Sequence, residues 1–132
     1  MTMRRAVITG VGAVSCLGLT SARMWEGLCS GASGIGPIRA FDPSGLPCKF
    51  GGEVPEYNIR DFVPKSYRKA TKLMCRDIEL AVVAADEAFR MSGLVTKAID
   101  ETKVSVEATR MASVIGAGLI SCEIPELVPA IQ

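Results

Sequence analysis

The stretch that determines the fold is RRAVITGVGAVSCLG, residues 4–18. Its β-branched run at residues 6–8 leads into Gly10 and Gly12, a pattern typical of a short buried strand followed by a tight turn. Two arginines before an apolar run also resemble the start of a signal peptide. However, Thr9 and the two glycines interrupt that run, which argues against export. The stretch therefore predicts a buried strand and turn at the start of an α/β core.

A strand followed by Gly10 and Gly12 also invites comparison with a dinucleotide-binding turn. That motif needs glycines at GxGxxG spacing at a helix N-terminus, and its third glycine position falls on Ser15. The related TGxxxGxG pattern fails at Val14 and Cys16. We therefore interpret the turn as a place where backbones pack closely together, for which glycine is suited.

A short helix and a long irregular segment are expected next. Thr20 or Ser21 can cap a helix that carries Trp25 on one face, and Gly31 can end it. Residues 31–64 are rich in Gly and Pro, which predicts an irregular excursion. Such a length of irregular chain is unusual in a small free-standing domain and needs a larger body to lie against.

The clearest helical periodicity covers residues 66–92 and ends at Gly93. Its expected buried face is Ala70, Met74, Ile78, Ala81, Ala85 and Phe89, with part of the burial supplied by a partner copy or by the rest of a longer protein. Residues 111–115 read as a second buried strand that ends in glycines. Ser121 would cap a last helix, whose expected buried face is Ile124, Leu127, Val128 and Ile131.

Composition excludes several classes of function. The chain has 132 residues, which suits one domain, and 48% of them are hydrophobic. A net charge of +1 and only 5% aromatic residues argue against nucleic-acid binding. No stretch approaches the ~20 apolar residues of a membrane span. We therefore expect a protein that binds neither nucleic acid nor membrane.

The cysteines and the absence of histidine bear on chemistry and compartment. Five cysteines without a CxxC pair, and no histidine, argue against a zinc site or a complete disulfide framework. The simplest interpretation is a reduced, cytoplasmic protein with small buried thiols. None of these cysteines is expected to act as a nucleophile, because no histidine can serve as its base.

The order and spacing of these features resemble the start of the β-ketoacyl-acyl carrier protein synthases, the condensing enzymes of fatty acid synthesis. The resemblance is strongest over residues 4–42, 65–93 and 111–119. It implies an α/β class, with residues 1–132 as a partial N-terminal synthase domain. The expected architecture is a partial thiolase-like fold, a fragment of the N-terminal half of a layered α/β/α/β/α arrangement. Cys16 departs from the proline usual at its position.

The resemblance also implies a reaction. The family carries out decarboxylative Claisen condensation of acyl and malonyl-acyl carrier protein, in fatty acid or polyketide synthesis. It uses a cysteine and two histidines, which the resemblance places beyond Gln132. We therefore assign no catalytic residue and no metal ligand, and expect the chain to be inactive alone. No bound cofactor is expected, because phosphopantetheine arrives on the carrier protein.

Two groups of residues acquire possible roles from the resemblance. Lys65, Arg68 and Lys69 match positions on the surface that meets the acidic acyl carrier protein. From the residues alone, the basic cluster, which also includes Lys72 and Arg76, is better explained as a solvated helix face, and only the resemblance makes docking an equally good explanation. Gly118 and Leu119 match residues that border the acyl-chain pocket in the family. For an isolated chain, a strand end packed against helices explains them equally well.

Three hypotheses about function stay open at this point. The chain is part of a condensing enzyme, a non-catalytic fragment that binds acyl carrier protein or a synthase subunit, or a truncated reading frame without a separate role. The expected partners are acyl carrier protein and either a second copy, in a homodimer, or a longer synthase chain. The length of the native reading frame would discriminate among the hypotheses.

Overall fold

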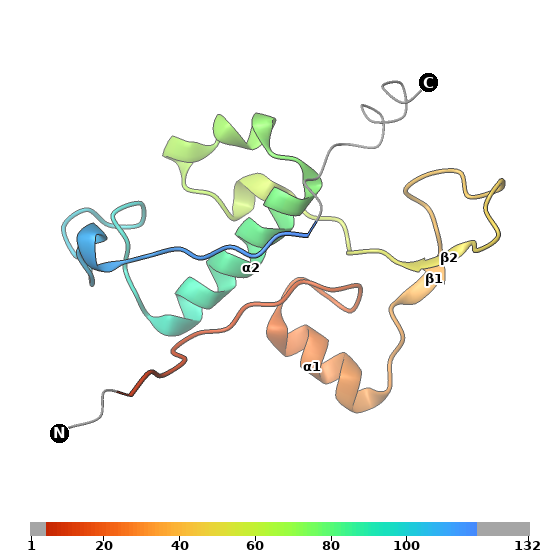
Figure 1. The fold of residues 1–132 in the computed structure, drawn as a ribbon, viewed down its shortest axis with the longest axis horizontal. Helices are drawn as coiled ribbons and strands as arrows, with labels where there is room; N and C mark the ends of the chain where they lie inside the picture. Colours follow the sequence, from red (N-terminus) through yellow and green to blue (C-terminus); the bar gives the residue numbers. More distant parts are fainter. Residues whose placement is uncertain (1–4, 119–132) are drawn as a thin grey trace.

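The computed structural model describes residues 5–118, whose course Figure 1 shows. These residues form two α-helices, α1 (Ser21–Ser30) and α2 (Arg76–Ser92). Strands β1 (Ile35–Pro37) and β2 (Phe50–Gly52) form an antiparallel pair in which Ile35 lies opposite Gly52. Short 3-10 turns complete the elements: η1 (Ile59–Asp61), η2 (Lys65–Tyr67), η3 (Ala70–Leu73) and η4 (Ala108–Arg110). The helix expected from Ser121, with Leu119 and Cys122, lies outside the described residues.

The predicted helix ends are confirmed where a local cap defines them. Thr20 is extended, and its side chain accepts a hydrogen bond from the Arg23 N–H at 3.2 Å. Gly31 ends α1 and Gly93 ends α2, both with φ of 70°. This left-handed conformation favours glycine, so a glycine at each position stops the helix.

The predicted start of the long helix is wrong. Residues 65–73 form 3-10 turns, and Met74 and Cys75 are extended, so α2 begins only at Arg76. The buried Thr71 stabilises the earlier turns, because its hydroxyl donates to the Arg68 carbonyl at 2.8 Å. Local side-chain bonds of this kind compete with α-helix formation. Apolar spacing cannot reveal such a break, because Met74 before it and Ile78 after it are four residues apart, as in a continuous helix.

The two predicted strands at residues 6–8 and 111–115 are also not formed. Neither segment has a pairing partner within residues 5–118. Their β-branched side chains are between 77% and 95% exposed; these are Val7, Ile8, Val114 and Ile115. A strand needs a hydrogen-bonded neighbour, and β propensity depends strongly on packing against that neighbour. The sequence pattern therefore indicates a tendency to pair that the described residues do not satisfy.

The face expected to be buried is only partly covered within the described residues, and the prediction that a second copy or the rest of a synthase covers the remainder stays a prediction. Val83 is the buried side chain of α2, at 1% exposure. Of the expected face, Met74 and Phe89 are half-buried, and the exposed members are Ala70, Ile78, Ala81 and Ala85. Residues 81–85 are all apolar, so the helix offers more than one possible apolar face. Close approach of residues 10–12 to Ala84 and Ala88 selects the one that packs.

Several large apolar side chains are exposed to solvent. Trp25 and Leu28 on α1 are exposed, and so are Ile35 and Phe50 on the two-stranded sheet. In Figure 1 the sheet projects away from α2. Over residues 5–118, no helix combines the length and the apolar character needed to cross a bilayer.

Candidate functional site

The glycine turn is held against α2 by the carboxylate of Glu87. It accepts hydrogen bonds from the Ala13 N–H at 3.0 Å, from the Ser21 N–H at 2.8 and 2.9 Å, and from the Ser21 hydroxyl at 2.7 Å. Burial by itself would raise the pKa of Glu87, but the bonds from Ser21 and Ala13 hold that pKa below its ordinary value. Glu87 thus joins the turn and the start of α1 to α2.

The glycines of the turn face backbone rather than an open cradle. A Cβ atom added at Gly10 would overlap the carbonyl oxygen of Ala88, and one at Gly12 would overlap that of Ala84. A phosphate-binding turn instead directs free N–H groups toward a ligand. This geometry supports the interpretation of the turn as a backbone packing site.

The cysteines occupy different environments. Cys16 is half-buried, and its Sγ lies within 3.0 Å of where a Cβ atom would stand at Gly34 or Gly52. It therefore packs against one end of the two-stranded sheet, where β1 begins and β2 ends. Cys75 is also half-buried, but the predicted burial is wrong for Cys29 and Cys48, which are exposed. Within residues 5–118 no three cysteine or acidic side chains come together to form a potential metal site.

The basic cluster of Lys65, Arg68 and Lys69 lies on the 3-10 turns before α2 rather than on α2 itself. The Arg68 N–H donates to the Lys65 carbonyl at 3.4 Å. Because a 3-10 helix has three residues per turn, Lys65 and Arg68 project to the same side. All three side chains are exposed, and none joins an ion pair with another residue of the described chain. Their charges are therefore open to a partner.

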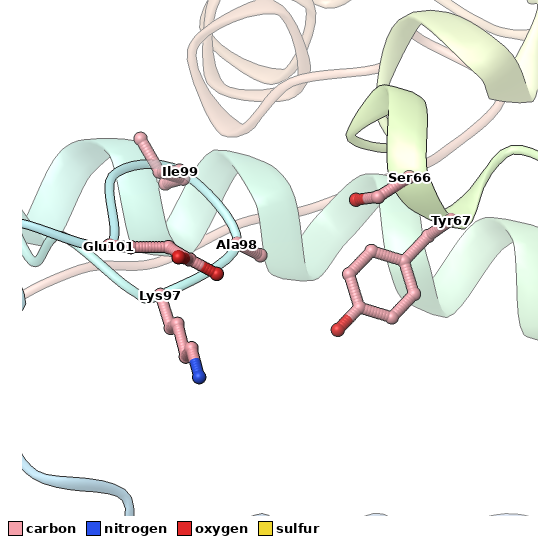
Figure 2. A pocket seen from close by; sticks show the side chains of 6 residues that line it. All are labelled: Ser66, Tyr67, Lys97, Ala98, Ile99 and Glu101. Atoms are coloured by element: carbon pink, nitrogen blue, oxygen red, sulfur yellow. The ribbon is translucent and has the colours of Figure 1, made fainter.

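A pocket of about 480 Å³ borders η2 at the two residues that lie between Lys65 and Arg68 in sequence (Figure 2). One wall comes from Ser66 and Tyr67 of η2, and the other comes from the loop that follows α2. The lining residues of that loop are Lys97, Ala98, Ile99 and Glu101. Sequence reasoning missed this pocket, because it treated residues 96–109 only as a polar linker. The signal available in the sequence was the presence of Lys97 and Glu101 on either side of Ile99 in that linker.

The other predicted site residues do not enclose a pocket within the described chain. Gly118 is exposed, and a Cβ atom added there would meet no atom within 4 Å. Leu119 lies outside the described residues. The assignment of Gly118 and Leu119 to an acyl-chain pocket stays a prediction.

Comparison with known proteins places most of the chain in one family. A family model described as "Beta-ketoacyl synthase, N-terminal domain" matches residues 3–121. The chain is 38% identical over 103 residues, 78% of its length, to 3-oxoacyl-[acyl-carrier-protein] synthase 2 of Synechocystis sp.. It is 38% identical over 125 residues, 90% of its length, to the protein of the same name from Coxiella burnetii.

A relative with another name also matches. The chain is 36% identical over 118 residues, 87% of its length, to nodulation protein E of Rhizobium sp. strain N33. In all three comparisons the matched region is a small part of the relative, namely 24%, 26% and 26% of its length. The chain thus spans about a quarter of the curated relatives that it matches.

Proposed function

The chain belongs to the β-ketoacyl synthase family, and from that membership we propose that it forms part of an enzyme of fatty acid or polyketide synthesis. The reaction would be decarboxylative Claisen condensation of acyl and malonyl-acyl carrier protein, an acyl transfer. The names of the relatives from Synechocystis and Coxiella support this reaction class. We propose that the described residues contribute to the N-terminal half of a layered thiolase-like fold. The unpaired β-branched segments support this, since a larger sheet would pair them.

We propose that the 132-residue chain does not condense substrates by itself. The family reaction needs a nucleophilic cysteine and two histidines, and this sequence contains no histidine to stabilise an oxyanion. Purified chain mixed with acyl- and radiolabelled malonyl-carrier protein is expected to form no labelled condensation product above the buffer blank. The synthase from Synechocystis, assayed in parallel, is the positive control. Turnover by the 132-residue chain would contradict the proposal.

The function that the geometry of the described residues supports best is docking of acyl carrier protein at Lys65, Arg68 and Lys69. The observation that carries it is the display of three exposed, unpaired cations on one short stretch of 3-10 turns. An acidic partner would be steered to such a surface. Exposed ion pairs contribute only about 0–1 kcal/mol each, so the binding is expected to be weak.

Reversing two of these charges tests the docking surface. Lys65→Glu/Lys69→Glu is expected to abolish the chemical-shift changes that the wild-type chain induces in isotope-labelled acyl carrier protein. The shifts induced by the wild-type chain should fade as salt rises toward ~0.5 M, because the Debye length shortens. Arg5→Glu/Lys49→Glu makes the same change of net charge away from the cluster and is expected to leave the shifts intact. Equal shifts from all three proteins would show that the cluster is only a solvated face.

The exposed apolar surface favours a second, non-catalytic function, namely association with another polypeptide. Trp25 and Leu28 on α1, with Ile35 and Phe50 on the sheet, are large side chains that a stable fold covers. We propose that a second copy or a longer synthase chain covers them.

We further propose that the protein acts in the cytoplasm and binds no cofactor of its own, because phosphopantetheine arrives on the carrier protein. Gly118 and Leu119 would border the acyl chain.

A further inference from the structure

We propose that the docking surface for acyl carrier protein extends across the pocket to Lys97, so that the partner contacts two segments of this chain. This inference rests on the proposed docking function and adds a second segment to it. Ser66 and Tyr67, which lie between Lys65 and Arg68 in sequence, form one wall of the pocket. Lys97 belongs to the opposite wall. Figure 2 shows the Tyr67 ring and the Lys97 side chain on either side of the opening and directed the same way.

The charges around the pocket favour an acidic partner. Lys97 is exposed, like Lys65 and Arg68, and joins no ion pair with another described residue. Asp100, the nearest acidic neighbour in the loop, is engaged within the loop by Thr102 and Lys103. Glu101 is the acidic residue among the pocket-lining residues. An acidic surface laid across the pocket would meet Lys97 and be opposed by Glu101, and it would reach Lys65 and Arg68 by extending along η2.

Apolar groups at the pocket indicate what kind of partner would bind there. The Tyr67 and Ile99 side chains are both more than half exposed. Both line the pocket, so an acidic protein surface that covers it would bury apolar as well as charged groups. A small free anion would gain nothing from these apolar groups, so the pocket suits the surface of an acidic protein better.

The loop that carries Lys97 is ordered by its own hydrogen bonds. The Ile99 and Asp100 N–H groups donate to the Thr96 carbonyl at 2.9 and 3.0 Å. At the base of the loop, the Ser105 N–H donates to the Val95 carbonyl at 2.9 Å, and the Val95 N–H donates to the Ser105 hydroxyl at 2.9 Å. A loop held in this way loses little further freedom when a partner binds.

The test measures dissociation constants for isotope-labelled acyl carrier protein by NMR titration at low salt. Lys97→Glu is expected to weaken binding about threefold to tenfold, as reversal of one exposed charge contact does. Glu101→Lys is expected to strengthen binding by a similar factor. Lys49→Glu, which makes the same charge change at the residue before β2 and outside the pocket lining, should leave the constant unchanged. Circular dichroism of each variant verifies that its helix content is retained.

The outcomes separate this inference from the docking function on which it rests. If Lys65→Glu/Lys69→Glu abolishes binding while Lys97→Glu and Glu101→Lys match the wild type, the extension across the pocket is wrong and the docking function stands. If the wild-type chain does not bind, or if no reversal changes binding, the docking function itself is wrong. Opposite effects of Lys97→Glu and Glu101→Lys support the two-segment surface.

Discussion

A methyl group at Gly12 is expected to detach residues 10–12 from α2 and to lower the temperature at which the helical signal is lost. The added Cβ atom in Gly12→Ala would overlap the Ala84 carbonyl oxygen and lie 2.8 Å from the Ala84 carbonyl carbon. These are backbone atoms of a helix, which cannot turn aside as a flexible side chain can. Overpacking typically costs 1–3 kcal/mol, and a clash with backbone belongs at about the upper end.

Gly36→Ala is the matched control for this substitution. Gly36 has no atom within 4 Å of an added Cβ and no left-handed backbone, so the same chemical change should leave stability within about 0.5 kcal/mol. Thermal unfolding of both variants is followed by circular dichroism at 222 nm. Amide hydrogen exchange at Ala84 and Ala88 reports on the contact itself. Coincident unfolding curves and unchanged exchange would show that the turn does not pack on α2 as described.

Glu87→Gln is expected to destabilise the chain by about 1–3 kcal/mol, through loss of charged hydrogen bonds. Both carboxylate oxygens of Glu87 accept bonds from donors on Ala13 and Ser21. An amide replaces one of these acceptors with an NH₂ group, which then faces other donors. Asp86→Asn is the matched control, because it makes the same change at the adjacent residue. Asp86 pairs with the largely exposed Arg90 at 2.7 Å, and such exposed pairs contribute little.

The effect of Glu87→Gln should depend on pH in one direction. The pKa of Glu87 in the folded chain lies below its ordinary value of 4.5, so the folded state favours the ionised carboxylate. The stabilisation that the ionised Glu87 carboxylate gives the folded state is fully present above about pH 4.5. It is lost as the pH falls through the lower pKa of the folded state. Urea unfolding between pH 7 and pH 3 should therefore bring the wild-type and Glu87→Gln curves together at the acidic end. If the difference in free energy of unfolding between the wild type and Glu87→Gln stayed constant over this range, the ionised carboxylate of Glu87 would not be what stabilises the fold.

Features determined by neighbouring residues were predictable from sequence. Thr20 caps α1 because its side chain reaches an N–H three residues away, and Gly31 and Gly93 end helices because only their own backbone conformation matters. The family was also recognisable, because its motifs keep their order and spacing over most of the chain. The cluster of Lys65, Arg68 and Lys69 was visible for the same reason, and its exposure is as expected for charged side chains.

Features determined by distant residues were not predictable in this way. Apolar spacing also missed the start of α2 at Arg76, although its cause, the bond from Thr71 to the Arg68 carbonyl that stabilises 3-10 turns, is local. Strand segments 6–8 and 111–115 have the right residues, but a strand forms only when a neighbour pairs with it, and none within residues 5–118 does. Periodicity alone could not select the buried face of α2, where five consecutive residues, 81–85, are apolar.

The sequence by itself thus determined the family, the caps and the basic cluster, because each depends on residue type and short spacing. The tertiary structure alone decided which face of α2 packs, through the close approach of Gly12 to Ala84. It alone joined Ala13 and Ser21 to Glu87, and brought Tyr67 and Lys97 to one pocket. These contacts depend on how distant segments meet in space, and residue spacing along the chain carries no record of that.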